Sequence, residues 1–123
     1  MQAQQYATAV FQEVSEGALV LARDDAVVFP LWYQREVKEP GSRVMVVAPA
    51  LLQYQWYWDQ LREREPGRVP SVDPGGWQAR LLALVEANLP SHPVYLTYEE
   101  ALLKEKYEMV SEGVVYRVAP NAR

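Results

Sequence analysis

The chain has 123 residues, half of them apolar, which is enough for one folded domain that buries about two-thirds of its unfolded surface. Its 12 Lys and Arg against 16 Asp and Glu give a net charge of −4 without a visible basic cluster, which argues against a nucleic-acid partner. It has no cysteine, which excludes disulfides and thiolate metal sites, and no apolar run near the roughly 20 residues of a membrane span, so we expect a soluble chain.

The first predicted elements are a helix and a buried strand. Tyr6, Val10 and Val14 share one side of a helix over residues 4–14. Residues 18–22 then form an unbroken apolar run, which is typical of a short strand that is buried on both faces.

An acidic turn joins this strand to a second helix. Arg23, Asp24 and Asp25 follow the strand directly, and helical spacing continues from there to Val37. We expect the carboxylate of Asp24 or Asp25 to cap the helix by accepting N–H bonds from its first turn. Pro30 should lie in or near that turn, because deeper in a helix proline removes a backbone hydrogen bond.

The middle of the chain predicts a strand, a helix and a long loop. Residues 44–47 are apolar and indicate a second buried strand, parallel to the first, since a helix separates the two. The buried face of the following helix is predicted to carry Leu51, Tyr54, Trp58 and Leu61. Residues 66–76 hold three prolines and three glycines, so this stretch is predicted to be irregular.

The last part predicts a helix, a strand and a hairpin. A helix begins at Trp77 and stops before Pro90, and residues 93–96 form a third strand. The spacing of Thr97 and Glu100 fits a capping box, with Thr97 as the cap of a short helix. Two strands over residues 107–118 then form a hairpin that turns at Gly113.

Together these elements predict one α/β domain over residues 1–123. We expect a three-layer sandwich with helices on both faces of a mainly parallel, Rossmann-like sheet. An antiparallel C-terminal hairpin should lie at one edge of this sheet.

Ligands in such sheets favour the carboxyl ends of the strands, which here supply Arg23, Asp24, Asp25, Thr97 and Tyr98. Two adjacent carboxylates could bind a cation or a sugar hydroxyl. The two carboxylates are also explained if one caps the helix and the other is solvated. We favour that interpretation, because side chains at consecutive positions diverge.

Other catalytic motifs are missing from the sequence. There is no GxGxxG after the first strand, and no serine lies in a nucleophile-elbow context. His92 is the only histidine, so a histidine-rich metal site is excluded. We therefore predict no catalytic residue, no metal site and no cofactor.

The aromatic residues are unusual in their crowding. Trp32, Tyr54 and Trp58 have the spacing of core residues, whereas Trp56 and Tyr57 must point away from the face that Tyr54 and Trp58 share. We expect Trp56 and Tyr57 to contact a protein or a membrane interface rather than a sugar. A homodimer formed through these two residues is a further possibility.

Four segments also follow one another in a recognisable order. Residues 17–37 run from an apolar strand through the acidic turn to Phe-Pro-Leu-Trp-Tyr. Residues 51–61 carry Leu-Leu, Trp-Tyr and Gln-Leu, residues 93–97 read Pro-Val-Tyr-Leu-Thr, and residues 112–118 read Glu-Gly-Val-Val-Tyr-Arg-Val. This order resembles the soluble C-terminal region of multi-spanning membrane glycosyltransferases of the C-type membrane fold, which are related to protein O-mannosyltransferases.

The resemblance implies an accessory domain that is tethered to a membrane protein on its extracytoplasmic side. Its partners would be the membrane-embedded half of the parent protein and an acceptor protein or glycan. The catalytic Asp of such enzymes would lie in that half, so no catalytic role transfers to this chain. Val27 stands where the family has a second Asp, which weakens a cation site at the turn.

The residues and the resemblance leave two functions of different classes. The leading hypothesis is a non-catalytic accessory domain that contacts the catalytic half or helps to position the acceptor. The alternative is a stand-alone small-ligand-binding or hydrolytic α/β domain that uses Arg23, Asp24, Asp25 and Thr97. The sequence leaves open whether the chain itself is an enzyme.

Overall fold

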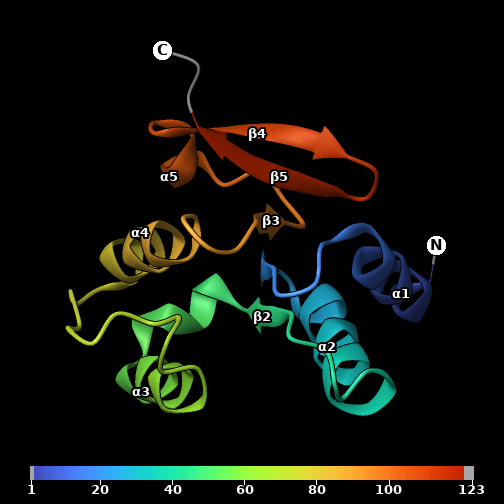
Figure 1. Cartoon of the computed structure of the whole chain (residues 1–123), viewed down its shortest axis with the longest axis horizontal. Helices are drawn as coiled ribbons and strands as arrows, with labels where there is room; N and C mark the ends of the chain where they lie inside the picture. Colours follow the sequence, from blue (N-terminus) through green and yellow to red (C-terminus); the bar gives the residue numbers. More distant parts are fainter. Residues whose placement is uncertain (1, 121–123) are drawn as a thin grey trace.

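The computed structural model describes residues 2–120 and arranges them as two helical layers with a sheet between them (Figure 1). The α-helices are α1 (Ala3–Glu13), α2 (Asp25–Tyr33), α3 (Gln55–Arg64), α4 (Trp77–Asn88) and α5 (Ala101–Lys104). A π-helix, η1 (Gln34–Lys38), extends α2, and a 3-10 helix, η2 (Pro49–Gln53), precedes α3. The strands are β1 (Leu19–Leu21), β2 (Met45–Val47), β3 (Val94–Leu96), β4 (Tyr107–Glu112) and β5 (Val115–Pro120).

The sheet is mixed, in the order β2-β1-β3-β5-β4. β1 pairs in parallel with β2 and β3, whereas β5 pairs antiparallel with both β3 and β4. The prediction of a mainly parallel, Rossmann-like sheet is therefore wrong. The longest strands belong to the hairpin, and a hairpin joined by a tight turn at Gly113 can only be antiparallel. The parallel pairing of β1 with β2 and the C-terminal hairpin are confirmed.

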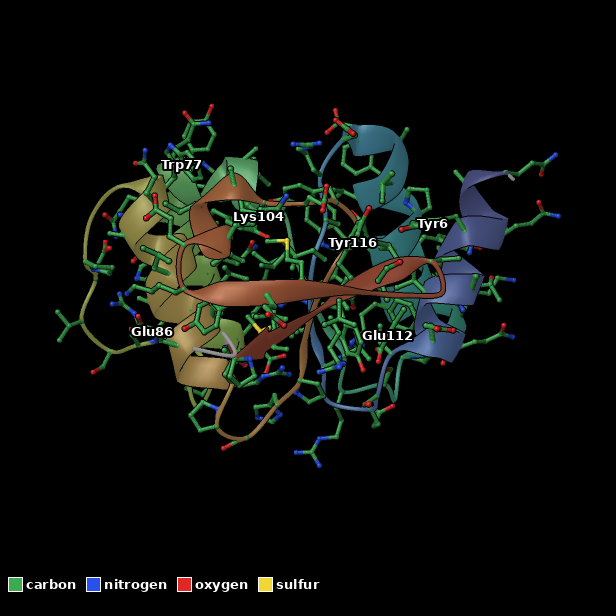
Figure 2. All side chains as sticks on the ribbon, turned by 90° about the horizontal axis from the view of Figure 1, so that it is seen from above. Tyr6, Trp77, Glu86, Lys104, Glu112 and Tyr116 are labelled. Carbon is green, nitrogen blue, oxygen red and sulfur yellow. The ribbon has the colours of Figure 1, made fainter. Side chains whose placement is uncertain are left out.

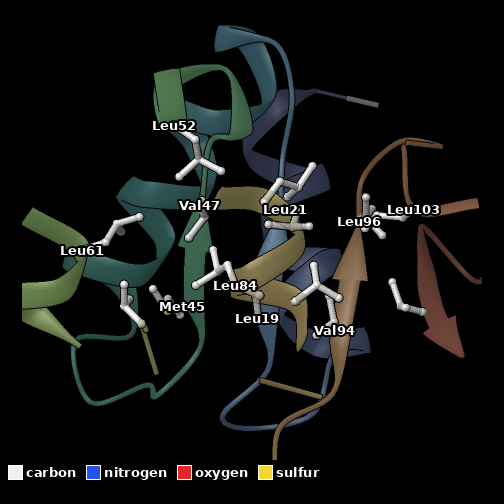
Figure 3. Packing of buried hydrophobic residues seen from close by; sticks show 14 of the residues in the cluster. Leu19, Leu21, Met45, Val47, Leu52, Leu61, Leu84, Val94, Leu96 and Leu103 are labelled. Carbon is white, nitrogen blue, oxygen red and sulfur yellow. The ribbon is translucent and has the colours of Figure 1, made fainter. Parts of the chain in front are cut away.

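β1 is buried on both faces, as its unbroken apolar sequence predicts. Leu19 and Leu21 face α3 and α4, in one core with Leu84 (Figure 3). Val20 faces the other way and packs in a second core with Val10 of α1 and other residues of α1 and α2. Because alternate strand residues point to opposite faces, one strand of three residues contributes to both cores.

The helix caps differ from their predictions. Asp24 is the N-cap of α2, but its side chain makes no cap hydrogen bond; its backbone carbonyl accepts the N–H groups of Val27 and Val28, both at 2.9 Å. Pro30 lies inside α2, beyond the first turn. Glu100, not Thr97, caps α5, since the N–H of Thr97 still donates to Leu21 of β1 at 3.0 Å and Thr97 thus continues the sheet.

Candidate functional site

The parallel strands β1, β2 and β3 end at the same edge of the sheet, and a cleft of about 410 Å³ opens there. We call it the carboxyl-edge cleft. It is lined by residues that follow the three strands and by the first residue of α4: Arg23, Pro49, Gln53, Trp77, Tyr98 and Glu100. This is the edge at which open α/β sheets hold their ligands.

Arg23 and Tyr98 line this cleft and contact each other. The Arg23 guanidinium lies 4.3 Å from the centroid of the Tyr98 ring, which is a cation–π distance. The Tyr98 hydroxyl donates to Oε1 of Glu100 at 3.0 Å, and Glu100 also accepts the N–H of Leu102 at 3.3 Å. Burial, followed by the charge of Glu100, raises the pKa of Tyr98, so the phenol keeps the proton that it donates. The cleft therefore presents a guanidinium held over an aromatic ring.

The other predicted strand-end residues do not join this pair. Asp24 and Asp25 are exposed and do not line the carboxyl-edge cleft. Thr97 lines a separate hollow of about 530 Å³ with Tyr6, because Thr97 and Tyr98 point to opposite faces. Figure 2 shows this separation, with Trp77 on the α4 side of the sheet and Tyr6 on the α1 side. The hypothesis that Arg23, Asp24, Asp25 and Thr97 act together is thus not supported by their placement.

Asp24 has a strained backbone at the start of α2. Its φ is 75°, in a region that glycine adopts readily and that costs other residues about 1–3 kcal/mol. The conformation turns the chain from the end of β1 into α2 within three residues. Asp24 is thus explained by the geometry of the turn, without a ligand.

The two aromatic residues singled out on α3 have opposite environments. Trp56 is 58% exposed, as predicted. Tyr57 is 4% exposed, and its hydroxyl oxygen accepts the N–H of Ala48 at 3.0 Å, so most of this side chain packs inside the fold and only its edge reaches the groove beside Trp56. Trp58 is in the core as predicted, but Tyr54 is 45% exposed because it precedes α3 and does not follow the helical spacing.

Trp56 borders a groove of about 490 Å³ between α3 and the α2–η1 helix. Its apolar lining consists of Trp32, Val46, Leu51, Tyr57 and Leu61. Arg64 and Glu36, whose side chains pair at 2.9 Å, link α3 to η1 across it.

Exposed rings extend this groove on both sides. The Phe29 ring lies 5.8 Å from that of Trp32, and the Tyr54 ring stacks at 6.1 Å on that of Trp56. Phe29 is 56% exposed. We call Phe29, Trp32, Tyr54 and Trp56 the aromatic face. Large exposed apolar patches on a protein surface commonly mark sites of contact with a partner, a ligand or a membrane.

Sequence reasoning missed a buried arginine beside the carboxyl-edge cleft. Arg80 binds both carboxylate oxygens of Asp73, at 2.8 and 2.7 Å, and donates to the carbonyl of Leu52 at 2.7 Å. These hydrogen bonds from Arg80 hold the pKa of Asp73 well below its usual range. The sequence held one indication that Arg80 is buried: it lies four residues before Leu84, on the apolar side of the helix.

Sequence reasoning also missed a concentration of positive charge. Arg35, Arg43 and Arg68 are far apart in the sequence, but they line one cleft at the amino ends of the parallel strands. The prediction that the chain has no basic cluster holds for the linear sequence and fails for the fold. Arg35 is in η1, Arg43 precedes β2 and Arg68 follows α3, so only the tertiary fold brings the three together.

Metal-ligating clusters and membrane-spanning helices are both absent from the part of the chain that the structure describes. In residues 2–120, no three side chains of the metal-ligating types lie close enough to hold a metal ion. None of the helices in that range has both the length and the apolar character needed to cross a membrane.

Comparison with known proteins places the chain in a family. The model of TMEM260-associated domain 2 matches residues 3–72, more than half of the chain. No curated protein and no solved structure matches. The matched range contains β1, the acidic turn and every residue of the aromatic face, and it ends before Trp77 and Tyr98. The chain belongs to the family of TMEM260-associated domain 2, named for its association with a membrane protein.

Proposed function

We propose that this chain is a non-catalytic accessory domain of a membrane glycosyltransferase, on the extracytoplasmic side, and that its aromatic face binds the membrane-embedded half. The observation that carries the proposal is the groove of about 490 Å³ beside Trp56 and Trp32, flanked by further exposed rings. Family membership supports a membrane-protein parent. The order of segments, which resembles that of the glycosyltransferase family, supports a glycosyltransferase as that parent.

The groove has the composition of a protein-binding site. Aromatic residues are enriched in the centres of protein interfaces, with polar residues around them. Here the apolar interior is bordered by the Arg64–Glu36 pair and by Gln60. A volume of about 490 Å³ accommodates a large apolar side chain of a partner, so we take the occupant to be an apolar segment of the membrane-embedded half.

The same face suits a position close to a lipid bilayer. Trp and Tyr are enriched at the level of the lipid headgroups, where one end of the ring is apolar and the other is polar. Trp56 and Tyr54 are both exposed and stacked, with their polar atoms available to water or headgroups. The carboxyl-edge cleft shares no lining residue with the groove. Docking through the aromatic face would therefore leave the cleft accessible to an acceptor.

The experiment uses the parent protein encoded by the native reading frame. In a parent whose cysteines outside this chain are replaced, Gln60→Cys on the groove or Gln78→Cys on the exposed side of α4 can each carry a photo-cross-linker, because the chain itself has no cysteine. We expect Gln60→Cys to cross-link to the membrane-embedded half, and Gln78→Cys to do so far less. Adding Trp56→Ala should lower the Gln60→Cys yield, because removing a central interface tryptophan costs about 2 kcal/mol or more.

Three results would overturn the proposal. The first is a native reading frame without membrane-spanning segments. The second is an equal cross-linking yield from Gln60→Cys and Gln78→Cys. The third is cross-linking from Gln60→Cys to lipid alone, which would make the face a membrane-contact surface without a protein partner.

One observation favours a second candidate function. The carboxyl-edge cleft of about 410 Å³ combines Arg23, held over Tyr98, with the half-exposed ring of Trp77. These groups suit a small ring-shaped polar ligand that stacks on Trp77 and hydrogen-bonds to Arg23. This candidate retains the ligand-binding part of the alternative hypothesis without Asp24, Asp25 and Thr97.

A further inference from the structure

The opposite edge of the sheet holds a second polar cleft, of about 400 Å³. It lies where the chain enters the three parallel strands: Gly17 precedes β1, Arg43 precedes β2 and His92 precedes β3. Its polar and charged lining consists of six side chains, those of Arg35, Ser42, Arg43, Glu65, Arg68 and His92. We call it the amino-edge cleft.

We infer that the amino-edge cleft binds the phosphate group of a phosphorylated ligand. Three arginines and one glutamate line it, so its walls carry an excess of positive charge in a chain whose net charge is −4. The planar guanidinium matches phosphate oxygens with paired hydrogen bonds, which makes arginine the usual residue for this group.

Arg68 is the buried cation of the cleft. It is only 9% exposed, and it donates to three neutral oxygens: the Asn88 side chain at 2.9 Å and the carbonyls of Arg43 and Gly17 at 3.0 and 2.7 Å. Among residues 2–120, no carboxylate lies within ion-pair distance of Arg68. The charge of Glu65 acts on Arg68 from beyond that distance, so the buried guanidinium has no close counter-charge, and a bound anion would supply one.

The remaining groups add charge and hydrogen-bond donors. The Arg35 guanidinium is held by the carbonyls of Val44 and Pro40, at 3.0 and 3.3 Å, so its position is fixed before a ligand arrives. Arg43 is exposed. Burial, aided by the charges of Arg68 and Arg43, lowers the pKa of His92, and its ring lies against the backbone of Gly17, so near neutral pH His92 shapes the wall of the cleft without adding charge.

A purely structural role for Arg68 is the competing explanation. Its hydrogen bonds tie the loop after α3 to the chain before β1 and β2, which stabilises the fold with or without an anion. Arg43 separates the two explanations, because its exposed side chain donates none of the hydrogen bonds that hold this loop. Glu65 offers a second test, because removing its negative charge should strengthen the binding of an anion to the cleft.

The first arm of the test titrates the complete chain with inorganic phosphate and follows the backbone amides by NMR. We expect saturable shifts at Arg43, Gly67 and His92. Arg43→Ala should weaken the affinity about tenfold, and Glu65→Gln should strengthen it. Arg62→Ala is the matched control, since Arg62 pairs with Asp59 on α3 outside the cleft, and it should leave the affinity unchanged.

The second arm identifies the source of the phosphate group. Flotation with vesicles of phosphatidylcholine containing phosphatidic acid, against phosphatidylcholine alone, measures binding to a lipid headgroup. Arg43-dependent flotation would assign the site to a lipid, and phosphate binding without flotation would assign it to a soluble phosphorylated compound. The inference fails if phosphate produces no saturable shifts, or if Arg43→Ala and Arg62→Ala behave alike.

Discussion

Arg80 holds together the long loop, η2 and the start of α3. It anchors Asp73 of the long loop, the carbonyl of Leu52 in η2, and the side chain of Gln55 at the start of α3. The Arg80 side chain is 5% exposed and that of Asp73 is 21% exposed, so the pair is largely shielded from water. In a shielded pair, removal of one partner leaves the other charge uncompensated.

Asp73→Asn should therefore destabilise the fold. We expect the free energy of unfolding at pH 7 to fall by about 2–3 kcal/mol, less than for a completely buried pair because Asp73 retains some solvent contact. Urea unfolding of the two proteins measures this difference. Asp59→Asn is the control, since the Asp59–Arg62 pair is exposed and such pairs contribute less than about 1 kcal/mol.

The same pair makes the effect depend on pH. The pKa of Asp73 is lowered in the folded state, so its stabilisation is complete above the unfolded pKa near 4. It is lost as the pH falls from there toward the folded pKa. The difference between the parent and Asp73→Asn should thus shrink as the pH falls from about 4 toward 2, and a constant difference would contradict the proposed charge pairing.

The edge strand β2 is protected by side chains from both neighbouring helices. Its outward carbonyls at Val44 and Val46 accept from Arg35 at 3.0 Å and from Trp32 at 3.2 Å. Just past the strand, Tyr57 accepts the N–H of Ala48. An uncovered edge invites pairing with another chain, and these side chains occupy backbone groups that such pairing would need.

Tyr57→Phe tests this protection at one hydrogen bond. The substitution keeps the ring but removes the acceptor of a buried N–H, which costs about 1–3 kcal/mol. We expect lower stability in urea and faster hydrogen exchange at the Ala48 amide. Tyr54→Phe changes an exposed ring in the same segment and should alter neither quantity; equal effects of the two variants would show that the Ala48 contact contributes nothing.

The sequence predicted the elements better than it predicted their contacts. The run 18–22 and the hairpin were identifiable because their periodicities reflect burial directly. The burial of Tyr57 was not predicted, because local spacing cannot show that its hydroxyl reaches the N–H of Ala48. In the carboxyl-edge cleft, Arg23 and Tyr98 were predicted and meet, whereas Trp77, Gln53 and Glu100 come from segments whose approach depends on the tertiary fold.

The mixed sheet also has consequences for how the chain folds as a unit. β1 lies between β2, which precedes residue 72, and β3, which follows it. One core of the sheet likewise needs α4, through Leu81 and Leu84. The range that matches the family model is therefore shorter than the range that completes the sheet and its cores.

A fragment of residues 1–72 should consequently not fold by itself. It lacks Leu81, Leu84, Val94 and Leu96, each fully buried and worth about 1.5–3 kcal/mol, which together approach the 5–15 kcal/mol of a small domain. It also exposes one whole edge of β1. We expect circular dichroism to show no cooperative melting for the fragment, and mixing with residues 73–123 to restore it. If the fragment melts cooperatively on its own, residues 1–72 are sufficient to fold. This result would contradict the dependence of β1 on β3.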